Sequence, residues 1–262
     1  MFAATLLSYV VFATAVLAAP RGTGLAGRVA RRAEGSHLSH PKQVVENPVN
    51  GNVSNVEYSS NWAGAVYAES SGYFKAVTGT FTVPTPSAPN GGSGTYAASA
   101  WVGIDGDTCE NAILQTGVDF TISNGEVSYD AWYEWYPDYA YDFSGISISA
   151  GDEIKVTVTA SSETAGTAVI ENVSTGKTVT KSITSSYSLC EENAEWIVED
   201  FEEGSSLVNF ADFGTVTFTS ATATTSSGSI GPGSASIIDI EQNGEVLTSV
   251  SISSSEVVVK YV

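Results

Sequence analysis

The stretch Ile154-Lys155-Val156-Thr157-Val158 alternates apolar and polar side chains at every step. This two-residue period is typical of a β-strand with one buried face. The same alternation returns in residues 146–149, 216–219 and 250–253. These runs therefore predict several strands, each with one face turned toward a core.

Turn-forming residues separate the runs, among them Asn90-Gly91 and Asn243-Gly244. No stretch shows a long helical period. Many short strands in one chain predict an all-β fold, a β-sandwich or jelly roll. Residues 220–236 are rich in Ser and Thr, and we predict a loop or a weak edge strand there.

The N-terminus has the features of a secretory signal. Residues 1–19 contain a short apolar run that ends in Ala18-Ala19, directly before Pro20. The run is too short for a membrane span, and no later segment is long and apolar enough to be one. We therefore expect a secreted, extracellular protein without a membrane partner. The alternative is a retained anchor.

Residues 20–56, called the prosegment below, are rich in Gly, Pro, Ser and Asn and show no apolar period. We interpret them as a basic propeptide that is removed from residues 57–262, and the alternative is a disordered tail that stays attached. The chain has 29 acidic and 10 basic residues. Two of the acidic and five of the basic residues lie in residues 1–56. Residues 57–262 therefore keep 29 − 2 = 27 acidic and 10 − 5 = 5 basic residues, a net charge of −22.

The strong negative charge of residues 57–262, called the body below, argues against nucleic acid or anionic membranes as partners. It would attract a basic prosegment, and the attraction would fade as carboxylates protonate. We therefore expect the prosegment to inhibit at neutral pH and to be released in acid.

Both histidines, His37 and His40, lie in the prosegment. The predicted mature part thus has no partner for a Ser/His or Cys/His nucleophile and none of the commonest zinc ligands. Carboxylates, amides, hydroxyls and aromatic rings remain, and we predict no metal and no organic cofactor. In a secreted chain the two cysteines, Cys109 and Cys190, are expected to form a disulfide. Asn172 begins an N-glycosylation motif.

Gln115 ends an apolar run shortly before a glycine, so its amide either points outward or lies in a lined cavity. Farther along, strand alternation places Asp130, Trp132, Glu134 and Tyr136 on one face. Aromatic walls with carboxylates suit extended peptides and sugars alike. The alternative is an aromatic core strand with carboxylates at its rim.

Glu199 is flanked by Ile197 and Phe201 on its own predicted face. Burial among apolar neighbours raises the pKa of a carboxyl group, which suits general acid or base catalysis. The alternative is an ordinary exposed acidic strand, since most acidic residues are solvated.

Together these segments resemble the eqolisin family of glutamic peptidases. The resemblance covers residues 58–262 and rests on segments 60–64, 100–109, 113–117, 129–137 and 197–203. It implies a β-sandwich of two curved antiparallel sheets, of the jelly-roll or concanavalin-like type. It also implies a catalytic pair, Gln115 and Glu199, and a disulfide between Cys109 and Cys190. The residues that match the family's substrate cleft are Trp101, Asp105, Glu134, Trp62, Asp130 and Tyr136.

The resemblance implies a secreted acid endopeptidase that acts on proteins and peptides, and we expect a monomer by default. Glu199 would take a proton from the attacking water, and Gln115 would hold that water and stabilise the oxyanion. Two alternatives stay open. One is a β-sandwich glycoside hydrolase that uses Glu134 and Glu199, and the other is a non-catalytic carbohydrate-binding protein.

Overall fold

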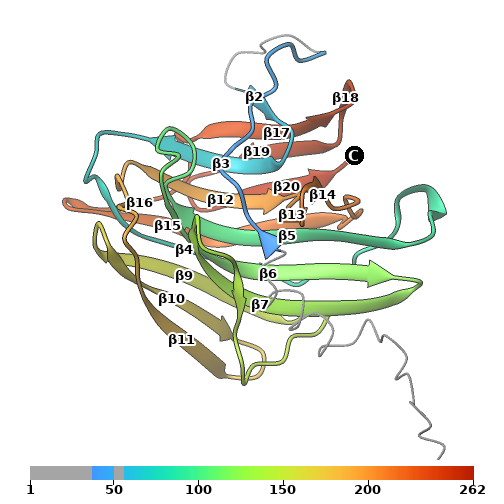
Figure 1. The fold of residues 1–262 in the computed structure, drawn as a ribbon, viewed down its shortest axis with the longest axis horizontal. Coiled ribbons are helices and arrows are strands. Elements are labelled where there is room, and N and C mark those ends of the chain that lie inside the picture. Colours follow the sequence, from blue (N-terminus) through green and yellow to red (C-terminus); the bar gives the residue numbers. More distant parts are fainter. Residues whose placement is uncertain (1–36, 50–55) are drawn as a thin grey trace, which may run out of the picture.

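A computed structural model describes residues 37–49 and 56–262, so the predicted signal peptide lies outside the described residues. Nearly every regular element is a β-strand, and two large, mainly antiparallel sheets pack face to face (Figure 1). This confirms the predicted all-β sandwich. In the described part of the chain no helix is long and apolar enough to cross a membrane.

The first sheet carries the residues proposed from the sequence. Its nine strands run in the order β18-β17-β3-β12-β5-β6-β7-β8, and β2 pairs in parallel with β17. The strand bounds are β2 (Val56–Ser59), β3 (Trp62–Ala68), β5 (Thr95–Ile104), β6 (Ile113–Ser123), β7 (Glu126–Tyr136), β8 (Tyr141–Asp142), β12 (Asn193–Glu199), β17 (Ser236–Gln242) and β18 (Glu245–Val246).

The second sheet has eight strands in the order β11-β10-β9-β4-β15-β20-β19, with β16 paired to β15. The strand bounds are β4 (Phe74–Thr82), β9 (Glu153–Ser162), β10 (Ala165–Asn172), β11 (Lys177–Thr184), β15 (Thr215–Thr225), β16 (Gly228–Ile230), β19 (Thr248–Ile252) and β20 (Val257–Tyr261). A third, small sheet joins the prosegment to the body, in the order β1 (His37–Leu38), β13 (Glu202–Glu203) and β14 (Ser206–Leu207).

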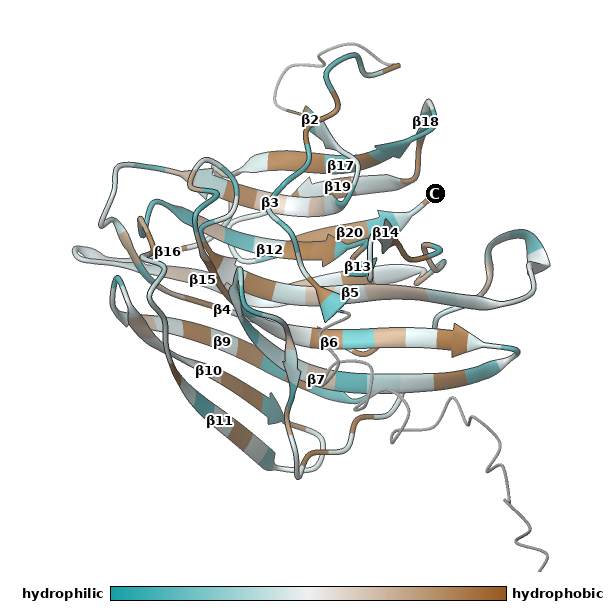
Figure 2. Ribbon diagram, in the orientation of Figure 1, coloured by the Kyte–Doolittle hydropathy of each residue, from teal (hydrophilic) through white to brown (hydrophobic). Residues whose placement is uncertain are grey.

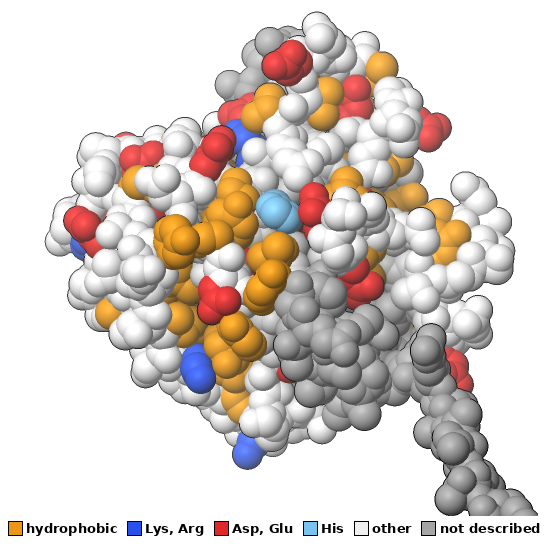
Figure 3. Space-filling view, viewed as in Figure 1, with side chains coloured by type: hydrophobic (Ala, Val, Ile, Leu, Met, Phe, Trp, Pro, Cys, Tyr) orange, Lys and Arg blue, Asp and Glu red, His pale blue; other side chains and the backbone are white. Residues whose placement is uncertain are grey.

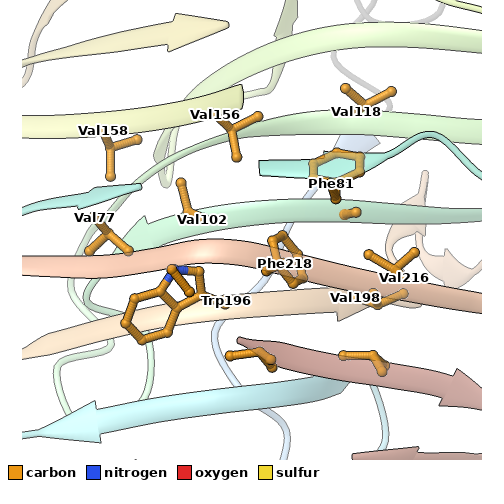
Figure 4. Packing of buried hydrophobic residues seen from close by; sticks show 14 of the residues in the cluster. Val77, Phe81, Val102, Val118, Val156, Val158, Trp196, Val198, Val216 and Phe218 are labelled. Carbon is orange, nitrogen blue, oxygen red and sulfur yellow. The ribbon is translucent and has the colours of Figure 1, made fainter. Parts of the chain in front are cut away.

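The main core lies between the two large sheets. Val102 and Trp196 of the first sheet face Val77, Val156 and Phe218 of the second, all of them buried (Figure 4). Figure 2 shows the alternation of hydropathy along the strands. The alternating run at residues 146–149, which we predicted to be a strand, is not one in the structure. Because each strand gives every second side chain to this core, the intervening residues of the first sheet are left for its other face.

The prediction for residues 220–236 is wrong in its first part. Residues up to Thr225 continue β15, which pairs with both β4 and β20 and is therefore a central strand. Ala221 and Ala223 are buried, whereas Ser220, Thr222 and Thr224 beside them are more exposed. The alternation is thus present, but alanine carries too little apolar surface to make it evident in the sequence.

The predicted disulfide is present between Cys109 and Cys190, whose Cα atoms lie 6.1 Å apart. It joins the segment after β5 to the segment before β12. Closing this loop of 81 residues contributes roughly 4–5 kcal/mol in the chain-entropy model. The bridge therefore ties the segment after β5 to the start of β12, the strand that carries Glu199.

The predicted glycosylation of Asn172 does not fit the structure. Its side chain is fully buried, and Nδ2 donates hydrogen bonds to Ser147 O (3.1 Å) and Asp152 Oδ2 (2.8 Å). A glycan would replace one of these hydrogens and would need open space at Nδ2, so the folded domain disfavours this modification. A second motif, at Asn52, lies outside the described residues.

Candidate active site

Three rows of side chains lie across the face of the nine-stranded sheet that turns away from the main core. The register of β3, β12, β5, β6 and β7 fixes these rows. In strand order, the rows are Trp62, Glu199, Ser99, Asp119, Asp130; then Gly64, Ile197, Trp101, Gly117, Trp132; and then Val66, Glu195, Gly103, Gln115, Glu134. The two predicted catalytic residues thus share one face with a tryptophan row between them.

The prosegment crosses this face. In Figure 1 its blue trace passes in front of the nine-stranded sheet, and Figure 3 shows a pale blue prosegment histidine at the surface beside red carboxylates. Gln115 Nε2 donates a hydrogen bond to Ser39 O (3.1 Å), and His40 N donates to Glu199 Oε1 (3.2 Å). Gln115 and Glu199 therefore contact the carbonyl and the N–H of the same peptide bond.

Glu199 is fully buried, and burial raises its pKa to about 8. Hydrogen bonds from Trp101 and from the backbone of His40 act in the opposite direction, because they stabilise the charged form. Gly117 lies beside Trp101 in the sheet, and a Cβ added to it would lie 2.4 Å from Trp101 Cβ. Glycine at this position therefore leaves room for the Trp101 side chain.

Three predicted cleft residues contact the prosegment, and a fourth contacts Glu199. Trp62 Nε1 donates to His40 O (3.0 Å), and Ser39 N donates to Glu134 Oε2 (3.2 Å). The Tyr136 ring packs at 5.7 Å from the imidazole of His40. The fourth, Trp101, donates a hydrogen bond from Nε1 to Glu199 Oε2 (2.9 Å).

The other two predicted cleft residues have different surroundings. Asp130 lies directly opposite Asp119 in the first row and is buried. Asp105 accepts hydrogen bonds from four backbone N–H groups, those of residues 190–193, so its carboxylate orders the segment beside the disulfide. Burial raises the pKa of Asp105, and these four donors counteract the increase.

Sequence reasoning missed three residues that hold the prosegment histidines. Asp119 Oδ2 lies 3.4 Å from His37 Nδ1, and Phe201 stacks on the same imidazole with ring centroids 4.2 Å apart. Glu202 Oε2 lies 3.2 Å from His40 Nε2. Asp119 could have been found, because it shares the strand face of Gln115 at two-residue spacing.

A second cluster of carboxylates holds Lys42. Its Nζ pairs with Asp107 and, at 2.6 Å, with Glu57, and its side chain is 7% exposed. Burial acts to lower the pKa of Lys42, but the two carboxylates outweigh it, and the pKa lies above its ordinary value. Lys42 is therefore bound by acidic groups of residues 57–262.

Among the described residues, one group has the proximity of a metal site: Asp105, Cys109 and Cys190, whose ligand atoms lie within 4.8 Å of one another. Both sulfurs are joined in the disulfide, and the Asp105 oxygens accept backbone hydrogen bonds. This group therefore offers no thiolate to a metal ion.

A buried carboxyl and a buried amide contact the two ends of one peptide bond, so this site binds a polypeptide backbone. The peptidase A4 family profile matches residues 60–261. The chain belongs to the peptidase A4 family.

Two named relatives match over nearly the whole chain. Aspergillopepsin-2 of Aspergillus niger is 53% identical over 98% of this chain and 99% of the relative. Scytalidopepsin B of Scytalidium lignicola is 44% identical over 99% and 98%. A crystal structure of scytalido-glutamic peptidase with a transition state analog inhibitor has 47% identity and a TM-score of 0.71, and covers 78% of this chain and 98% of that one.

Proposed function

We propose that this chain is a secreted acid endopeptidase in which Glu199 is the general base and acid and Gln115 stabilises the oxyanion. One observation carries the proposal: the Ser39–His40 peptide bond has its carbonyl on the Gln115 amide and its N–H on the Glu199 carboxyl. A crystal structure of scytalido-glutamic peptidase with a peptide based transition state analog supports a peptide as the substrate class.

The proposed reaction follows from these contacts. Glu199, as a carboxylate, takes a proton from water, whose oxygen adds to the substrate carbonyl carbon. Gln115 donates its N–H to the developing oxyanion, a contribution of roughly 3–4 kcal/mol by comparison with other hydrolases. Gln115 Oε1, which has no hydrogen-bond partner among the described residues, is free to hold the water. Glu199 then protonates the leaving nitrogen.

The prosegment is proposed to inhibit by occupying this site. It lies over Gln115 and Glu199 and contacts both, so another polypeptide cannot reach the pair while the prosegment is bound. When the prosegment leaves, water reaches Glu199 and its pKa falls toward that of an ordinary carboxyl. Acid promotes this release because the strongly negative charge of residues 57–262, which attracts the basic prosegment, decreases in acid.

The remaining parts of the proposal concern processing and assembly. Residues 1–19 act as the signal peptide, residues 20–56 as the propeptide, and residues 57–262 as the catalytic domain. Trp62, Trp101, Asp105, Asp130, Glu134 and Tyr136 are proposed to line the substrate cleft. We propose a monomer, since one chain supplies both Gln115 and Glu199 to the site.

The test is hydrolysis of a denatured protein by the acid-treated secreted product at about pH 3, close to the ordinary pKa of solvated carboxyl groups. The Glu199→Gln variant is the control, and a β-glucan is the second substrate. We expect protein cleavage that is lost in the variant. Cleavage of the glucan alone would favour the glycoside hydrolase, and binding without turnover of either substrate would favour a carbohydrate-binding protein.

A further inference from the structure

We propose that the Ser39–His40 bond is the first bond that this enzyme cuts in its own chain. The inference rests on the proposed roles of Glu199 and Gln115. It goes further, because it identifies a segment of the prosegment as a substrate and assigns the register in which that segment binds.

The contacts of three successive peptide bonds single out this bond. At Ser39–His40 the carbonyl accepts from Gln115 and the N–H donates to Glu199. At Leu38–Ser39 the N–H donates to Glu134 instead. The next bond, His40–Pro41, has no N–H to place on Glu199, because its nitrogen belongs to proline. Of these three, only Ser39–His40 presents both reacting atoms to the pair.

The chain is held on the N-terminal side of this bond. His37 and Leu38 form β1 and pair with Glu203 and Glu202 of β13. The His37 imidazole also stacks on Phe201. These contacts fix residues 37 and 38 in an extended conformation, in which proteins commonly bind peptide segments.

The chain is held equally well on the C-terminal side. Lys42 N donates to Gly106 O (2.9 Å), and Gln43 N donates to Asn61 Oδ1 (2.9 Å). The Lys42 ammonium lies between Asp107 and Glu57. Anchors on both sides place the bond in a fixed position against the pair, which turns cleavage into an intramolecular reaction with its orientation already established.

The step balances as an ordinary hydrolysis. The oxygen of water adds to the Ser39 carbonyl carbon, and Glu199 takes one of its protons. The C–N bond to His40 breaks, and Glu199 returns the proton to the His40 nitrogen. The products are a carboxyl group at Ser39 and an α-amine at His40, and the only co-reactant is water.

Cleavage at this bond does not clear the cleft by itself. Residues from His40 onward stay bound, because Ser60 N donates to Gln43 O (2.8 Å) and Val45 N donates to Tyr58 O (2.9 Å). We therefore expect a transient species that begins at His40, before later processing removes the rest of the prosegment.

The experiment follows the purified full-length proform in acid by intact mass and N-terminal sequencing, at several protein concentrations. We expect His40 as the earliest new N-terminus within residues 37–262, formed at a rate independent of concentration. In His40→Pro the leaving nitrogen changes and its N–H is lost, so formation of this terminus should slow by about 100-fold or more, the size of a general-acid contribution. His40→Ala keeps the N–H and should still be cut.

Two results would overturn the proposal. One is a different first N-terminus in this part of the chain, and the other is equal cleavage at residue 40 in His40→Pro and His40→Ala. The same samples are assayed on an unrelated denatured protein. Hydrolysis without any His40 terminus would overturn the cleavage site alone, whereas neither hydrolysis nor self-cleavage would overturn the proposed function itself.

Discussion

Trp101 Nε1 donates a 2.9 Å hydrogen bond to Glu199 Oε2, and both side chains are fully buried. The donor comes from β5 and the acceptor from β12, its neighbour in the sheet. Because an N–H donor stabilises the carboxylate over the neutral acid, Trp101 limits the increase in the pKa of Glu199 that burial causes. Trp101 therefore helps to set the pKa of Glu199, the group proposed to act as the base.

Trp101→Phe should lower kcat by about 10–100-fold, since hydrogen bonds to charged groups contribute roughly 1.5–3 kcal/mol. It should also move the acid limb of the kcat profile to higher pH, because loss of the donor raises the pKa of Glu199 and activity needs the ionised form. The pH–rate profile of the mature enzyme measures both effects. Trp135→Phe is the matched control, as Trp135 Nε1 donates to Tyr187 O instead. An unshifted acid limb would contradict this role.

Gln115→Ala should lower kcat by about 10²–10³-fold with a much smaller change in KM, because an oxyanion donor acts mainly in the transition state. Steady-state hydrolysis of a peptide substrate measures the two constants. Thr121→Ala, on the same strand, should leave both nearly unchanged. The glycoside hydrolase alternative gives Gln115 no role, so full peptidase activity in Gln115→Ala would remove the main support for the proposed mechanism.

Lys42→Met should shorten the lag before the proform becomes active, because it removes the ammonium that Asp107 and Glu57 bind and keeps a stem of similar length. Each 1.4 kcal/mol lost from prosegment binding corresponds to about a tenfold change, and we expect an effect of roughly that size. The lag is measured at about pH 5, where solvated carboxyl groups are mostly ionised. Lys177→Met, an exposed position on β11, is the control. Equal lags in both variants would show that the Lys42 pairs do not hold the prosegment.

Much of the fold and part of the site could be predicted because the signals are local. Alternation along the strands predicted the sandwich. The apolar neighbours of Glu199 in the sequence were compatible with burial but left an exposed acidic strand as the alternative, and the structure shows the side chain fully buried. Cleft residues such as Trp62 and Glu134 required the family resemblance, since alternation gives only the face on which they lie. Their contacts with Ser39 and His40 now support that assignment.

Other features depend on which strands become neighbours, and no local sequence pattern predicts this pairing. The position of Asp119 beside Ser99 and Asp130 follows from the register of β5, β6 and β7. The four backbone donors to Asp105 come from residues 190–193, far along the chain. The position of the prosegment on this face depends both on strand register and on charge. The charge balance predicted only an attraction between the prosegment and the body.

Glu195 provides the last prediction, on stability against pH. It is fully buried, neither oxygen has a hydrogen-bond partner among the described residues, and burial raises its pKa well above the ordinary value. The negative charges of Asp105 and Asp107 raise it further. A raised folded-state pKa gives stability that is fully present below the unfolded pKa and is lost as pH rises through the folded pKa.

Burial likewise raises the pKa of Asp200 to about 7 and that of Asp239 to about 6. The free energy of unfolding should therefore fall as pH rises from about 4 toward 8. Urea unfolding of the Glu199→Gln proform, which should not cut itself, measures this fall. Adding Glu195→Gln removes one titrating group and should reduce the fall, whereas adding Glu256→Gln, an exposed residue just before β20, should not. An equal fall in the two double variants would mean that Glu195 is not held in its neutral form.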